Sequence, residues 1–307
     1  TESWDGTSWT EVAELATARY DLNTGGGGAS SSLALAFGGN KDPGQANETE
    51  SYDGSSWTAQ PAMNNSRQRG GAGAFGTQTA AVASGGNSTA KTADSEEYNG
   101  TSWTEVNNVN TGRKSGVGTG NSATAALFSA GGTPSYVANV EQWDGTNWTE
   151  VADINNARGE NPGGGGTSTS SIIAGGYDPG GKENKAETWD GTSWTEVGDL
   201  NTARNGMAGA GGSNTDAMVF GGDLHPTSPR FSANTETWDG TSWTEVNDLN
   251  TGRLNLGGAG VSSSQAIAFG GATTPNSENE TETWNGTSWT EQNDLGTASR
   301  YMGNSSN

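Results

Sequence analysis

One seven-residue phrase recurs seven times along the chain, at intervals of about 46 residues. It reads aromatic, Asp or Asn, Gly, Thr or Ser, Ser or Asn, Trp, Thr, and all 12 tryptophans lie inside its copies. A fixed period of this size is typical of repeat architectures, in which a single unit cannot bury its apolar face alone. We therefore expect one repeat-built domain over residues 1–307, although this length alone would suggest two domains.

A single unit, residues 253–291, has the pattern of four short strands. The expected strands cover residues 254–260, 266–269, 280–284 and 288–291. Turn-forming residues separate them, and Asn285-Gly286 predicts a two-residue type I′ hairpin, because that turn needs positive φ at both positions. Four short antiparallel strands in each unit predict an all-β fold, a β-propeller of four-stranded blades.

Two further features repeat with the phrase. An apolar strand ends in Gly-Gly at 38–39, 85–86, 131–132, 175–176, 221–222 and 270–271, and an arginine precedes each unit. This order resembles the kelch repeat, and the resemblance covers the whole chain. It implies kelch-like blades with units at about 19–60, 67–105, 113–150, 158–196, 204–245 and 253–291.

The two ends of the chain carry partial units. Residues 1–12 contain only third and fourth strands, and residues 298–307 contain only the start of a first strand. We expect them to form a seventh, split blade, although its second strand is missing from the chain. The alternatives are a six-bladed ring with an overhanging hairpin, or a section cut from a longer array.

The chain is strongly acidic, with 35 acidic and 14 basic residues and a formal charge of −21. Such a surface repels nucleic-acid phosphates and anionic headgroups, so we expect no nucleic-acid partner. No apolar run is long enough for membrane insertion. The absence of cysteine excludes disulfides and thiolate ligands, and His225 is the only histidine, so no metal site is assigned.

The repeated aromatics and arginines are interpreted as scaffold. Identical positions in every unit favour blade core over sugar-stacking platforms for the tryptophans, and backbone pairing over an anion-binding ring for the arginines. The expected partners of the arginines are neighbouring carbonyl groups or the glutamates 11, 105, 150, 196, 245 and 291. The structural set is Trp9, Trp57, Trp103, Trp148, Trp194, Trp243, Trp289, Arg19, Arg67, Arg113, Arg158, Arg204 and Arg253.

The segment between each Gly-Gly pair and the next repeat aromatic varies in length, with 12, 11, 10, 12, 15 and 12 residues in successive units. Function concentrates on loops that a rigid scaffold presents, so we place ligand binding here, with neutral drift as the alternative. The candidate ligand-binding residues are Asp223, His225, Arg230, Phe231, Tyr136 and Tyr177. The acidic loops at 40–44 and 177–180 are candidate Ca²⁺ sites, because Ca²⁺ prefers oxygen ligands. No other cofactor is expected.

No catalytic constellation is visible, so we expect a protein that is not an enzyme. The phrase Trp-Asp-Gly-Thr-Ser-Trp-Thr-Glu is also similar to kelch-like repeat proteins of marine tailed bacteriophages. This resemblance implies an extracellular or virion-surface protein, such as a tail fibre, appendage or decoration, with other virion or cell-surface proteins or surface glycans as partners. A lectin-like cell-surface adhesin is the alternative, and a glycan-processing enzyme on a propeller scaffold is the third hypothesis.

Overall fold

The computed structural model describes residues 1–22, 32–68, 74–87, 92–160, 163–273, 275–300 and 304–305. All regular secondary structure in these residues is β-strand, as predicted. Two compact units are present. The first comprises Thr1 and Glu11–Asp153, and the second comprises Glu2–Thr10 and Ile154–Asn307. Within the described ranges, no helix is long and apolar enough to cross a membrane.

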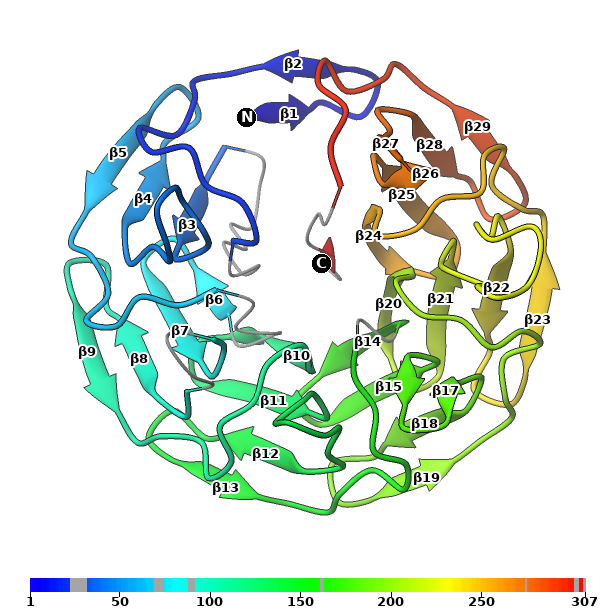
Figure 1. The fold of residues 1–307 in the computed structure, drawn as a ribbon, viewed down its shortest axis with the longest axis horizontal. Helices are drawn as coiled ribbons and strands as arrows, with labels where there is room; N and C mark the ends of the chain where they lie inside the picture. Colours follow the sequence, from blue (N-terminus) through cyan, green and yellow to red (C-terminus); the bar gives the residue numbers. More distant parts are fainter. Residues whose placement is uncertain are drawn as a thin grey trace. The chain divides into compact units, whose positions relative to one another are not determined.

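The first unit contains three antiparallel sheets, which are coloured blue to green in Figure 1. The first sheet has three described strands, β3 (Ala34–Phe37), β4 (Thr49–Tyr52) and β5 (Trp57–Gln60). The second contains β6 (Ala74–Thr77), β7 (Ala80–Ser84), β8 (Ser95–Tyr98) and β9 (Trp103–Val106). The third contains β10 (Val117–Ser122), β11 (Ala125–Ser129), β12 (Val140–Trp143) and β13 (Trp148–Glu150).

Besides short hairpins, the second unit contains three sheets of four or five strands. The first consists of β14 (Gly163–Thr167), β15 (Ser170–Ala174), β18 (Ala186–Trp189) and β19 (Trp194–Glu196). The next consists of β20 (Ala208–Ser213), β21 (Asp216–Phe220), β22 (Thr235–Trp238) and β23 (Trp243–Val246). The last consists of β24 (Gly257–Ser262), β25 (Gln265–Phe269), β28 (Thr281–Trp284), β29 (Trp289–Glu291) and β30 (Asn304–Ser305).

Three short hairpins complete the second unit. β1 (Glu2–Trp4) pairs with β2 (Trp9–Glu11), whose last residue belongs to the first unit. Two others lie in loops, β16 (Tyr177–Asp178) with β17 (Gly181–Lys182), and β26 (Ala272–Thr273) with β27 (Asn276–Ser277). Counted along the chain, the sheets repeat the predicted order of first, second, third and fourth strands. This is the four-stranded antiparallel organisation expected of a propeller-like fold.

The repeated tryptophans are core residues. In each third–fourth strand pair the two repeat aromatics lie opposite each other, as Trp189 does with Trp194, and these ring centroids are 5.5 Å apart. Trp143, Trp189 and Trp238 are at most 2% exposed. Second strands such as Ser170–Ala174 supply apolar side chains to the same interior. The aromatic phrase therefore fixes the position of a buried cross-strand pair in each sheet.

The predicted type I′ hairpin is wrong. Four residues, not two, lie between the paired Trp284 and Trp289. Of these, Gly286 alone has positive φ, at +91°. The side-chain oxygen of Asn285 accepts the amides of Thr287 and Ser288 at 2.9 and 3.0 Å, and the Asp or Asn of every other copy does the same. The Asp or Asn is present because its side chain caps the turn.

The Gly-Gly pair of the third unit is offset by one position from the sequence assignment. Ala130 and Gly131 have φ of +60° and +105°, which matches Gly38 and Gly39 at +62° and +95°. Gly132 instead aligns with Asn40, because both residues form a bridge to the preceding connector. An alanine therefore holds a left-handed conformation that the other units give to glycine.

The two ends of the chain do not share a sheet within the described residues. β30 lies parallel to β24, with Gly258 opposite Asn304, whereas β1 pairs with β2. The described strands therefore neither complete nor exclude the expected split blade of segments 1–12 and 298–307. Residues 301–303 and 306–307, and residues 23–31 of the first unit, lie outside the described residues.

Candidate functional site

A buried Arg–Glu pair fixes the base of each variable loop. In the last sheet the Arg253 guanidinium donates to Glu282 Oε1 at 2.7 Å and to the carbonyl oxygens of Gly270 and Glu280 at 2.9 and 2.6 Å. Both charged side chains are at most 1% exposed. The same ion pair recurs at 2.5–2.7 Å for Arg19–Glu50, Arg67–Glu96, Arg113–Glu141, Arg158–Glu187 and Arg204–Glu236. We call this pair the arginine latch.

The predicted glutamate partners of these arginines are wrong. The fourth-strand glutamates 11, 105, 150, 196, 245 and 291 are all exposed. The true partner is the third-strand glutamate two residues before the repeat aromatic, and it is as regular in the sequence as the tryptophans. Side chains alternate along a strand, so this glutamate shares the buried face with the aromatic. Burial lowers the pKa of Arg67, and Glu96 opposes that shift.

The same glutamates also hold the connector between successive sheets. Glu282 Oε2 accepts the Asn250 backbone amide at 2.7 Å and the Asn250 side-chain amide at 2.8 Å. The equivalent backbone contacts join Ala16 to Glu50, Asn64 to Glu96, Asn110 to Glu141, Asn155 to Glu187, Asn201 to Glu236 and Gly296 to Glu2. Each connector is therefore hydrogen-bonded to the third strand of the sheet or hairpin that carries the glutamate named with it.

The loops between second and third strands all start from the same geometry. In all six units the residue after the positive-φ pair bridges backward to the connector, and in five of them it also pairs forward among the described residues, near the end of its own loop. Asp223 does so with Asn205 and Phe231, and Asn40 does so with Tyr20 and Gln45. Between these fixed ends the loops differ: residues 40–45 span six positions, whereas residues 223–231 span nine. The bridged ends of these loops are therefore constant, and the length and sequence between the ends vary.

The longest loop touches the neighbouring hairpin β16–β17 within the second unit. Lys182 Nζ donates to the His225 carbonyl oxygen and lies 3.7 Å from Asp223 Oδ2. Arg230 Nε donates to Asp223 Oδ1 at 3.2 Å, and its guanidinium lies 5.5 Å from the centroid of the Phe231 ring. The His225 amide donates to the same carboxylate at 2.9 Å. Asp223 therefore organises the loop between two cations.

The ionisation of Asp223 follows from these contacts. Partial burial disfavours the charged carboxylate, but the His225 amide, Arg230 and Lys182 outweigh it and hold the pKa of Asp223 below its ordinary value. The carboxylate is thus ionised and engaged with its neighbours near neutral pH. His225 and Arg230 themselves are exposed at the loop tip.

The structure brings together most of the predicted binding residues, but not all of them. Asp223, His225, Arg230 and Phe231 share one loop, and Tyr177 pairs across the β16–β17 hairpin with Lys182, which touches that loop. Tyr136 lies in the other unit. Sequence reasoning missed Lys182, which stands six positions after the Gly-Gly pair and could have been noticed as the only cation in that hairpin.

Of the two acidic loops, the one at 177–180 contributes a carboxylate pair, Asp178 with the nearby Glu183. Burial and then the neighbouring Asp178 raise the pKa of Glu183, and Asp178 in turn accepts the amides of Gly180 and Gly181 at 2.6 and 2.9 Å. Over the described residues, no group of three Asp, Glu, His or Cys side chains is placed to hold a metal ion.

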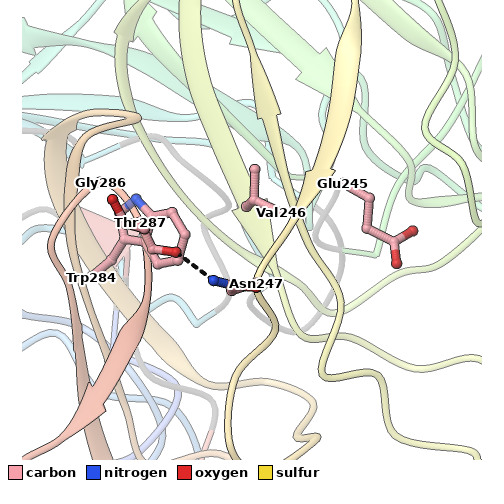
Figure 2. Close-up of a pocket in the computed structure, with 6 residues that line it drawn as sticks. All are labelled: Glu245, Val246, Asn247, Trp284, Gly286 and Thr287. Atoms are coloured by element: carbon pink, nitrogen blue, oxygen red, sulfur yellow. Dashed lines mark hydrogen bonds between the residues drawn. The ribbon is translucent and has the colours of Figure 1, made fainter.

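A separate open pocket of about 480 Å³ lies between β23 and the β28–β29 hairpin. Figure 2 shows its lining residues and the hydrogen bond from Asn247 Nδ2 to the Thr287 carbonyl oxygen, at 2.8 Å. Trp284 is the one aromatic residue in the lining, and it is only 4% exposed. Its ring has little free face for stacking on a sugar, so the loop cluster is the better candidate site.

Comparisons with known proteins assign no family to this chain. No protein-family model matches it, and no curated protein matches it either.

Proposed function

We propose that this chain is a non-enzymatic binding or structural module, built as a seven-bladed kelch-like β-propeller whose variable loops carry recognition. The single observation that carries this proposal is the contrast between the constant contacts of the scaffold and the variable loops that the scaffold presents. Latches, connectors and hairpin caps repeat with nearly the same contacts, whereas the segments between second and third strands differ in length and charge. A rigid scaffold that presents dissimilar loops is a common design for binding.

Contacts of the N-terminal hairpin support its place as the outer half of a seventh blade. Glu2 accepts the amides of Gly296 and Thr297, as the third-strand glutamates do in the other connectors. Trp9 Nε1 donates to Thr281 Oγ1 at 2.8 Å, and its ring lies 5.2 Å from that of Phe269. Between consecutive sheets, Trp289 makes the same two contacts with the second and third strands of the preceding sheet.

An extracellular or virion-surface setting is part of the proposal. The phage resemblance suggests a tail fibre, appendage or decoration, and a surface of net charge −21 favours solubility and disfavours nucleic-acid partners. The alternative is a lectin-like adhesin. The exposed Arg230 beside Phe231 favours it, because a cation and an aromatic ring at a loop tip suit a polar ligand with an apolar face.

A glycan array tests the proposal. The purified protein is screened against bacterial surface glycans with and without Ca²⁺, and the bound glycans are examined for cleavage. Selective binding without product supports the lectin-like form, and dependence on Ca²⁺ would assign the acidic loops a role. If no glycan binds, capture of a virion or cell-surface protein partner supports the structural form. Cleavage of any glycan overturns the proposal of a non-enzymatic module.

A further inference from the structure

The dipeptide Asn-Gly occurs three times in the chain, at positions 99–100, 205–206 and 285–286. An asparagine side chain loses its amide most readily before glycine, because glycine has no Cβ to hinder attack by its own backbone nitrogen. Asn99 and Asn285 are exposed at the tips of the hairpins β8–β9 and β28–β29, whereas Gly206 is buried. The three copies therefore place one reactive dipeptide in two different environments.

The chemistry of deamidation defines what the environment must supply. The glycine nitrogen attacks the side-chain carbon Cγ, so a new N–Cγ bond closes a succinimide ring while negative charge develops on Oδ1. The Cγ–Nδ2 bond then breaks, and ammonia leaves with the proton of the glycine N–H. Water opens the ring to aspartate if it breaks the new N–Cγ bond, and to isoaspartate if it breaks the original peptide bond. Hydrogen-bond donors aimed at Oδ1 stabilise the charge that develops in the first step.

The hairpin cap places such donors at two of the three asparagines. Oδ1 of Asn99 accepts the backbone amides two and three residues further along at 2.9 and 3.0 Å, and Oδ1 of Asn285 accepts the equivalent amides at the same distances. These distances are those of an oxyanion hole. Asn205 Oδ1, in contrast, is buried without a hydrogen-bond partner. Charge on that oxygen would be both desolvated and unpaired.

The hydrolysis product is the residue that the other five hairpins already carry. Their aspartates accept the same two amides at 2.7–2.9 Å, and these amides lower the pKa of each carboxyl: Asp5, Asp53, Asp144, Asp190 and Asp239. A charged acceptor strengthens such hydrogen bonds. Isoaspartate would instead turn Cγ into a backbone carbonyl and lengthen the turn, so the folded hairpin favours aspartate.

We propose that Asn99 and Asn285 are modification sites at which the folded hairpin promotes its own deamidation to aspartate, whereas Asn205 is spared. Each reaction consumes one water and releases one ammonia, and it needs no other reactant. The modification converts two neutral caps into the carboxylate caps of the other five repeats and adds a negative charge to each hairpin. The caps of the seven hairpins thereby become equivalent.

Peptide mass spectrometry of protein aged at mildly alkaline pH tests the proposal. The native deamidation rate at each asparagine is divided by its rate in the guanidinium-unfolded chain, which removes the effect of local sequence. We expect this quotient to exceed unity at Asn99 and Asn285, because exposure alone can only restore the unfolded rate. At Asn205 it should be at least roughly tenfold lower, because the donors are absent. Quotients at or below unity at both hairpins, or equal quotients at all three sites, would overturn the proposal.

The products are a second readout. Isoaspartyl methyltransferase labels isoaspartate, and we expect a smaller isoaspartate fraction from the folded protein than from the unfolded chain. Equal fractions would show that the cap does not select aspartate, and would overturn that part of the proposal.

Asp239→Asn provides a matched gain of site. It gives residues 239–243 the sequence Asn-Gly-Thr-Ser-Trp, which is identical to residues 285–289. The hairpin already directs two amides at the side chain of residue 239, at 2.8 and 2.9 Å. We expect position 239 to deamidate at a rate close to that of Asn285, with the urea midpoint showing that the variant is folded. A folded variant that stays unmodified at position 239 would contradict the role of the cap.

Discussion

The indole N–H of the fourth-strand tryptophan is hydrogen-bonded to the preceding sheet in some repeats and is unpaired in others. Trp289 Nε1 donates to Thr235 Oγ1 at 2.9 Å, and both side chains are buried. One sheet earlier the equivalent indole is Trp243, and the residue at the start of the facing third strand is Ala186. Trp243 Nε1 is buried without a partner. Between these two sheets, the threonine hydroxyl is the difference between a paired and an unpaired indole.

Replacing Thr235 by valine should reproduce the unpaired condition. The shape is nearly kept, so the main cost is a buried N–H without an acceptor, about 1–3 kcal/mol. At a urea m-value of about 2–3 kcal/mol/M, a cost of about 2 kcal/mol lowers the unfolding midpoint by roughly 0.7–1 M. In the reciprocal variant, Ala186→Thr, the new hydroxyl should recover about 1 kcal/mol, less the strain of two added atoms in a packed position.

Urea unfolding followed by tryptophan fluorescence measures both changes. The matched control is Thr237→Val, two positions along the same strand, where the side chain is partly exposed and faces Thr244 across the sheet. Its effect should stay within about 0.5 kcal/mol. A Thr235→Val change that destabilises the protein no more than Thr237→Val does would show that the Thr235 hydroxyl does not stabilise the buried indole.

Two further predictions concern the latch and the hairpin cap. Glu187→Gln removes the partner of the buried Arg158 and should cost about 3–5 kcal/mol in unfolding experiments, whereas the exposed Glu196→Gln should cost less than about 0.5 kcal/mol; equal effects would contradict the latch. The Ser56 and Ser55 amides and the Ser55 hydroxyl lower the pKa of Asp53 from 3.8 to about 2. Because the folded pKa is depressed, the stability this carboxylate adds is complete above about pH 4 and is lost as pH falls toward 2. A carboxyl NMR titration checks this value, and an ordinary pKa would contradict the cap.

The sequence predicted most of the scaffold, because its determinants are local and repeated. Gly-Gly pairs, repeat tryptophans and alternation placed three strands of the 253–291 unit to within about two residues, while its first strand begins three residues later than expected. The hairpin type was missed because Asn-Gly suggests a two-residue turn, whereas the tryptophan pair sets the loop at four residues. Local turn preference was overridden by the register of the buried pair.

The candidate site was harder to predict because its contacts join segments distant in sequence. The third-strand glutamate was visible as a repeat, yet its pairing with arginine depends on which side chains face inward. Lys182 meets His225 and Asp223 across 43 and 41 positions, in two loops without shared periodicity. Repeat analysis averages over such irregular residues, so it identified the variable loop but not its neighbour.

The most direct test of the central claim is a loop exchange. Residues 223–231 are replaced by the six-residue segment of 40–45, whose ends make the same bridges. As a control, residues 40–45 are replaced by the segment of 132–136, which is closed by the equivalent Gly132–Tyr136 bridge. Binding of each protein to the glycan or protein partner found by screening is then measured beside its urea midpoint. We predict that the 223–231 exchange abolishes binding, that the control exchange retains it, and that both midpoints stay near that of the parent. Full binding by the protein lacking 223–231, or unfolding of both exchanged proteins, would contradict a constant scaffold that presents variable binding loops.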